Sequence, residues 1–278
     1  SFRPQVAQSP ARKRGPEFGT DNLQLAAQIL WSDLAFLGPG SPSYTVRVLH
    51  ETLVEQALRS AHALGASLVF GSAAAIAAGS HALPVYEIYK VGEDPYWKPG
   101  LGILAGFGLE LAIVPHWNNT DGGAELDTSR CFMGENRFAA LLEMLPNTSV
   151  VLGLDEHTAC ILDLAENQIE VTGRGSVHLR CGGDWCDLQS GVYDAVDLRL
   201  GVVSSPGYDI PQAFADLPLR TDSPELEAPS VEAADLAAQR VQARLEKNWA
   251  RSDELRNQLL ALGWAVKDTP EGQTLIKA

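Results

Sequence analysis

Short runs of apolar residues, each ending at a polar or glycine-containing segment, recur along the chain. These runs predict buried strands at residues 34–37, 67–71, 109–114 and 150–154. Apolar positions with helical spacing predict helices over residues 44–64, 73–78 and 136–145. Buried strands that alternate with helices indicate a mainly parallel sheet with flanking helices, which is an α/β fold.

The pattern changes in the second half of the chain. Residues 159–180 alternate in polarity and predict a β meander, and residues 79–108, rich in glycine and proline, predict an excursion over the sheet. Residues 221–229 are rich in proline and glutamate and predict a linker, whereas residues 231–262 are charged and strongly helical. We therefore expect an α/β domain over residues 1–220 and a small helical domain over residues 226–278.

Composition narrows the classes of function. The net charge of −14 argues against a nucleic-acid backbone as the main ligand, since phosphate binding needs a basic surface. No segment is typical of a membrane span or of a secretion signal. The four cysteines are too few for a disulfide framework. Cys181 and Cys186 form one pair without a second, which favours two thiols near a hairpin over a zinc site. We expect a cytoplasmic protein without a metal.

Ser72 stands where a buried strand gives way to a run of small residues that predicts a helix. A sharp turn at this point exposes the hydroxyl and directs the next backbone N–H, that of Ala73, toward an oxyanion. The alternative is an ordinary N-cap serine, which is common at helix starts. Gly38-Pro39-Gly40 ends another strand and offers a second N–H at Gly40, although by itself this segment indicates only a turn.

An imidazole and two carboxylates follow the next two strands. His116 is a candidate base, and either Asp155 or Glu156 is a candidate acid that orients it. The alternatives are a histidine bonded within its loop and carboxylates that cap the next segment. His157 is a rival for the base, and Cys131, in a loop, is a rival nucleophile.

The ordered set of these segments resembles the dipeptidase E and cyanophycinase family, which has a class I glutamine amidotransferase-like fold. The resemblance rests on Gly38-Pro39-Gly40, Ser72 to Ala75, His116, Asn136-Arg137-Phe138 and Gly153 to Ala159. It implies Ser72 as nucleophile, His116 as base and Glu156 as orienting acid of a serine peptidase. It also implies early strands, and the residues before Gly38 are too few to supply them in full. Ala74 stands where the family has glycine.

We assign secondary roles to five further residues. Gly40 and Ala73 are predicted to hold the oxyanion through their backbone N–H groups. Asn118, Asp155 and Arg137 are predicted to contact the oxyanion or the substrate.

The tail resembles the C-terminal domain of cysteinyl-tRNA synthetases. The resemblance covers residues 243–256, 262–264 and 268–272. The catalytic motifs of a synthetase are missing, so we expect no aminoacylation. Since the chain is acidic, the resemblance favours a module for packing or partner binding over one that binds tRNA.

Two classes of function remain in view for the α/β domain. The first is a serine hydrolase that cleaves a peptide or isopeptide bond through an acyl-enzyme, without a cofactor. The second is a non-catalytic protein of the same fold that binds a peptide or small molecule. An RNA-associated module driven by the tail is a third hypothesis. We expect no membrane partner, and the sequence is compatible with a homo-oligomer.

Overall fold

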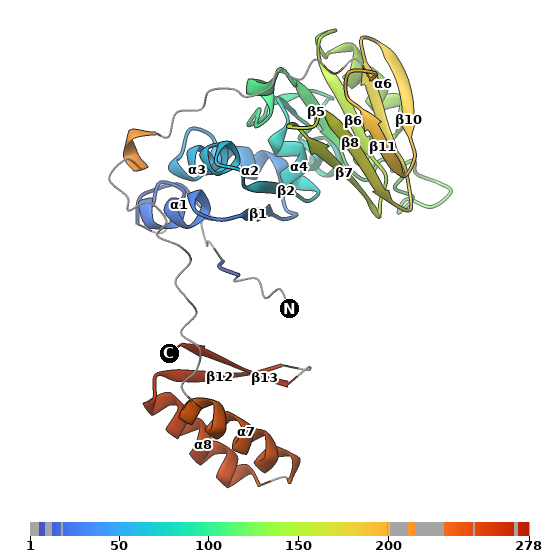
Figure 1. The fold of residues 1–278 in the computed structure, drawn as a ribbon. Helices are drawn as coiled ribbons and strands as arrows, with labels where there is room; N and C mark the ends of the chain where they lie inside the picture. Colours follow the sequence, from blue (N-terminus) through green and yellow to red (C-terminus); the bar gives the residue numbers. More distant parts are fainter. Residues whose placement is uncertain are drawn as a thin grey trace. The chain divides into compact units, whose positions relative to one another are not determined.

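In the computed structural model of the chain, the described residues are 6–8, 13–17, 19–198, 200, 211–214, 231–246, 248–269 and 272–277. The chain divides into two compact units, residues 1–217 and 218–278. The first unit is a mixed α/β structure with sheets and flanking helices, which confirms the predicted α/β class (Figure 1). Its described strand pairs are mostly antiparallel, whereas the sequence predicted a mainly parallel sheet. The predicted linker at residues 221–229 lies outside the described residues.

The elements of the first unit follow the predicted order closely. Its helices are α1 (Leu23–Leu30), α2 (Pro42–Leu49), α3 (Leu53–Ala63), α4 (Ala73–Ala78), α5 (Ser129–Phe132), α6 (Gly134–Glu143) and the short turns η1 (Glu87–Val91), η2 (Ala105–Phe107) and η3 (Gln212–Phe214). Its strands are β1 (Leu34–Leu37), β2 (Ser67–Phe70), β3 (His81–Ala82), β4 (Lys98–Pro99), β5 (Leu111–Val114), β6 (Val150–Leu154), β7 (Thr158–Asp163), β8 (Gln168–Gly173), β9 (Val177–Cys181), β10 (Asp184–Leu188) and β11 (Gly191–Asp194).

Among the described strands, parallel pairing occurs at two places. β1 pairs with β2, and β5 pairs with β6. Helices α1 and α3 lie beside the β1–β2 pair, and their apolar side chains share one core with α4 (Figure 1). In both pairs the strands run in the same direction, so their carboxyl ends lie at one edge. Within each pair, the polar residues that follow the two strands are thereby brought to one edge, although the two pairs belong to different sheets.

The predicted meander is divided between two sheets. β9 joins β6 to give a four-stranded sheet of order β10-β9-β6-β5, whereas β7 and β8 join β11. Apart from β5–β6, the strand pairs of these two sheets are antiparallel. A common core, including Leu152, Leu179 and Ile169, joins the two sheets face to face. The β6–β9 pairing places the residues that follow β6 next to β9.

The single helix expected over residues 44–64 is two helices. Thr52 begins α3 as its N-cap, and Glu55 accepts a hydrogen bond from the Glu51 N–H at 2.7 Å. Glu51 has a φ of 57°, which no helix interior accommodates. The Thr-x-x-Glu spacing of a capping box therefore interrupts the apolar periodicity and starts a new helix.

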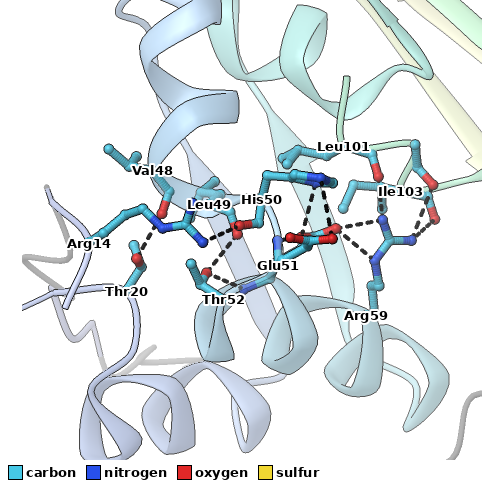
Figure 2. Close-up of polar contacts among 12 residues, drawn as sticks. Arg14, Thr20, Val48, Leu49, His50, Glu51, Thr52, Arg59, Leu101 and Ile103 are labelled. Carbon is cyan, nitrogen blue, oxygen red and sulfur yellow. Dashed lines mark hydrogen bonds and ion pairs between the residues drawn. The ribbon is translucent and has the colours of Figure 1, made fainter. Parts of the chain in front are cut away.

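Arg59 ties α3 to the segment that supports α4 (Figure 2). Its guanidinium donates to Glu55 Oε1 at 2.7 Å and to the backbone oxygens of Leu101, Gly102 and Ile103. Residues 101 and 103 donate in turn to carbonyls of Ala77 and Ala78 in α4. The helix that carries the residue after Ser72 is thus anchored at its far end.

The second unit has a core of its own. It consists, over its described residues, of α7 (Val231–Leu245), α8 (Trp249–Ala261) and the antiparallel pair β12 (Trp264–Thr269) and β13 (Gly272–Lys277). Ala233, Ala237, Leu259 and Val266 form the buried cluster. In neither unit is a described helix long and apolar enough to cross a bilayer.

Candidate active site

Ser72 lies on a sharp turn between β2 and α4. Its φ of 52° and ψ of −111° belong to a region that L-amino acids rarely adopt. Ala73, Ala74 and Ala75 are buried, so the helix begins close against neighbouring elements. The side chain of Ser72 makes no capping bond to α4, which removes the N-cap alternative. Its hydroxyl points to another group.

That group is His116, at the carboxyl end of β5. The Ser72 Oγ lies 2.9 Å from His116 Nε2. The backbone of His116, with a φ of 53°, also leaves the extended conformation. Its carbonyl accepts from Cys131 N at 3.2 Å, and the next residue, Trp117, donates to Leu154 O at 2.9 Å. These bonds fix the imidazole between the ends of β5 and β6.

Glu156 completes a chain of contacts. Its Oε1 lies 3.0 Å from His116 Nδ1 and accepts a second hydrogen bond from Asn119 Nδ2, also at 3.0 Å. The hydrogen bonds from Asn119 and His116 hold the pKa of Glu156 below its usual value, because they stabilise the carboxylate. An ionised Glu156 accepts from Nδ1–H, which leaves Nε2 to accept the hydroxyl proton of Ser72. The tautomer therefore suits a base.

A cavity of about 190 Å³ opens over Ser72. Gly40 and Ala73 line it, together with His116 and Glu156. The N–H of Ala73 belongs to the first turn of α4, whose N–H groups have no acceptor within the helix. The remaining wall is largely apolar or aromatic, with one further carboxylate, and includes Ile76, Val85, Tyr86, Phe132 and Asp121.

Three of the predicted contact residues lie elsewhere. Asn118 and Asp155 line a second cavity, because neighbouring residues at the strand ends direct their side chains to different sides. The Oδ1 of Asn118 accepts from the backbone N–H of Glu156 at 2.8 Å, and Asp155 contacts His178. Arg137 is exposed on α6 and lines neither cavity. These positions give the three residues no direct access to Ser72.

Two polar residues of this cavity that can bear on its chemistry were not singled out from the sequence. Asn119, 3% exposed, holds Glu156, and Asp121 lines the cavity. The sequence offered two adjacent asparagines after His116, and nothing in their order indicates which one faces the acid. The rival nucleophile Cys131 is 2% exposed, and burial raises the pKa of its thiol to about 12. It is a protonated, enclosed thiol at neutral pH.

Comparison with known proteins gives a different result for each unit. Residues 228–275 match the family of the cysteinyl-tRNA ligase anticodon binding domain. Cysteine–tRNA ligases of Burkholderia lata and Desulfovibrio desulfuricans are 55% identical over 40 residues and 51% identical over 65 residues, respectively. Those matches cover 14% and 23% of this chain, but only 8% and 13% of the two enzymes. The suspected resemblance of the tail is confirmed.

A longer and weaker match reaches beyond this domain. The cysteine–tRNA ligase of Geobacter metallireducens is 29% identical over 173 residues, which is 62% of this chain and 33% of that enzyme. The chain therefore spans a minor part of the ligases that it matches.

Among solved structures, a peptidase from an acI-B1 Actinobacterium is similar with a TM-score of 0.50 and 22% identity. The similarity covers 63% of this chain and 64% of that one. It shows that the matched part of this chain shares its fold with that protein.

Proposed function

We propose that the α/β unit is a serine hydrolase that cleaves a peptide or isopeptide bond through an acyl-enzyme on Ser72. The observation that carries this proposal is the unbroken series of contacts from Ser72 Oγ to His116 and on to Glu156, at 2.9 and 3.0 Å. The strained backbone of Ser72 adds support, since such strain is concentrated at catalytic sites. The peptidase-like fold is consistent with it.

Each group has a defined role in the proposed reaction. His116 Nε2 accepts the proton of Ser72 as Oγ bonds to the carbonyl carbon of the substrate. Backbone N–H groups at Ala73 and Gly40 stabilise the resulting oxyanion. His116 then donates the proton to the leaving amine, and the C–N bond breaks. Water, activated by the same imidazole, hydrolyses the ester and regenerates Ser72. No metal or organic cofactor takes part in these steps.

The test is hydrolysis of a mixture of dipeptides and ε-lysyl isopeptides, followed by mass spectrometry. The wild-type chain should consume at least one component. Ser72→Ala should lose the activity by on the order of 10⁶-fold, and Glu156→Gln by on the order of 10⁴-fold. The matched control is Ser67→Ala, because Ser67 is an exposed serine in β2, the strand that precedes Ser72. This variant should stay active. Equal turnover by wild type and Ser72→Ala would refute the proposal.

A non-catalytic binding protein is the alternative for this cavity. It predicts that a ligand raises the melting temperature equally in wild type and in Ser72→Ala, with no turnover. A hydrolase instead forms a covalent intermediate that Ser72→Ala cannot form. The two functions are therefore separated by a single variant.

The second unit supports a second candidate function, tRNA-related binding. The observation in its favour is the match of residues 228–275 to an anticodon binding domain. The net charge of −14 opposes it, since tRNA carries one negative charge per phosphate. Filter binding of the full chain to tRNA across a salt series tests this function. A steep fall in affinity with salt supports it, whereas no binding at low salt leaves a module for packing or protein partners.

A further inference from the structure

A second cavity, of about 560 Å³, is built from the same two strand ends as the proposed active site. It shares no lining residue with the cavity over Ser72. Trp117 follows His116 in the chain, and Asp155 precedes Glu156, yet both side chains belong to the second cavity. Its volume falls within the range of small-molecule sites, about 300–1,000 Å³.

Aromatic rings form the floor of this cavity. Trp117 is 5% exposed and has ring-centroid distances of 5.1 Å to Phe138 and 5.3 Å to Trp185. Gly153 lets Trp117 lie against β6, because a Cβ at this position would fall 2.5 Å from the indole. Trp185, on β10, is 43% exposed, and its indole ring lines the cavity.

Carboxylates dominate the charge around these rings. Asp155 and Asp187 contact the two nitrogens of His178 at 3.2 and 2.7 Å, and Glu135 is a third acid in the lining. The only lysine or arginine among the lining residues is Arg130. Its guanidinium lies 4.1 Å from the ring centroid of Trp117 and 3.8 Å from Glu135. Three carboxylates stand against one guanidinium and the imidazole of His178, so acidic groups remain in excess whether or not that imidazole carries a charge.

We propose that this cavity binds an alkylammonium group, such as the end of a lysine side chain or of a diamine. The exposed indole of Trp185 can attract a cation, whereas Arg130 and His178 already lie against the ring of Trp117. The excess of carboxylates neutralises the charge that enters. The same carboxylates would repel a phosphate-bearing ligand. The proposal concerns a binding site separate from Ser72 and does not depend on hydrolysis.

The test is calorimetric titration of the full chain with Nα-acetyl-lysine methylamide. The matched neutral probe is the same molecule acetylated at Nε, which keeps the chain and removes the charge. Trp185→Ala and Asp187→Asn each remove one exposed element of the cavity and should raise Kd about tenfold, as expected for the loss of a cation–π or an ion contact. Glu166→Gln, an exposed acid that lines neither cavity, should leave Kd unchanged.

Ser72→Ala separates this proposal from the hydrolase proposal. Retained binding of the charged probe by Ser72→Ala, with loss in Trp185→Ala, supports the second cavity as the site. Indole N–H resonances should then show Trp185 shifting with the charged probe alone, and circular dichroism should show both variants folded. No binding of the charged probe, equal binding of the acetylated probe, tighter binding of adenosine monophosphate, or binding that the cavity variants leave intact would each overturn the proposal.

Discussion

At the residue scale, the central feature is the backbone of Ser72. A φ of 52° with a ψ of −111° is a conformation that glycine adopts readily and other residues adopt at a cost of about 1–3 kcal/mol. The Gly71-Ser72-Ala73 sequence does not predict the positive φ of Ser72. Glycine, the residue that adopts such a φ readily, stands at position 71 instead. The sequence did indicate the three groups that meet here, since each follows a predicted strand. β5 and β6 are buried as expected, whereas β2, which precedes Ser72, has no buried residue. The turn at His116 decides which asparagine donates to Glu156. No local sequence pattern predicts that turn.

The strain at Ser72 leads to a stability prediction. Ser72→Gly should have a free energy of unfolding about 1 kcal/mol higher than Ser72→Ala, because glycine relieves the strain that alanine keeps. At an ordinary position glycine is the less stable of the two. Urea denaturation of both variants measures the difference. Ser72→Ala at least as stable as Ser72→Gly would contradict the strained turn.

Asn119 gives a second residue-scale prediction, which concerns pH. Its hydrogen bond lowers the pKa of Glu156, so Asn119→Ala should raise that pKa toward the usual value of a glutamate. The ionised Glu156 stabilises the native site above its unfolded pKa, and this contribution is lost as pH falls through the folded pKa. In the variant the loss should therefore begin at higher pH. Carboxyl ¹³C titration of Glu156 measures the pKa, and an unchanged value would refute the role of Asn119.

At the element scale, periodicity predicted β1, β2, β5, β6 and the helices around them within a few residues. It did not predict α1, the short strands β3 and β4, or the β12–β13 pair of the second unit. It joined α2 to α3, because the apolar spacing of the two helices runs on across the break. The Thr52-Leu53-Val54-Glu55 capping box is the local signal for the break, and apolar periodicity alone does not detect it. The division of the meander into two sheets had no such signal, since strand partners are chosen by tertiary packing.

The ion pair that anchors α3 predicts a large stability effect. Arg59→Met should cost roughly 3–5 kcal/mol of unfolding free energy, because it leaves the carboxylate of Glu55, 9% exposed, without its partner. It also removes the donors for the carbonyls of residues 101–103 (Figure 2). Arg47→Met, whose guanidinium lies over Tyr44, is the control and should change stability by about 0.5 kcal/mol at most. Equal effects of the two substitutions would show that the network has no special role.

At the scale of the whole molecule, the chain consists of two units, and each has a hydrophobic core made of its own residues. All residues of the proposed hydrolase belong to residues 1–217, and the match to the anticodon binding domain, residues 228–275, lies within residues 218–278. The sequence indicated this division through a change of composition near residue 221. The acidic net charge is a property of the whole chain and does not determine the charge of a single cavity.

Separate cores predict separate unfolding. Leu259→Ala, at a fully buried position of the second unit, should destabilise that unit by about 2–5 kcal/mol. The reactivity of Ser72 should remain unchanged, since the proposed site draws on the first unit alone. Calorimetry and active-site labelling of the same variant measure the two effects. A parallel loss of labelling would mean that the second unit supports the catalytic geometry.

The most direct test of the proposed triad is labelling with a fluorophosphonate, mapped by mass spectrometry. A serine activated by His116 and Glu156 attacks the phosphorus and retains the phosphonyl group as a stable adduct. We expect the adduct on Ser72 in the wild type, none in Ser72→Ala or His116→Ala, and an unchanged rate in Ser67→Ala. Absence of an adduct on Ser72 in the folded wild-type chain would contradict the account.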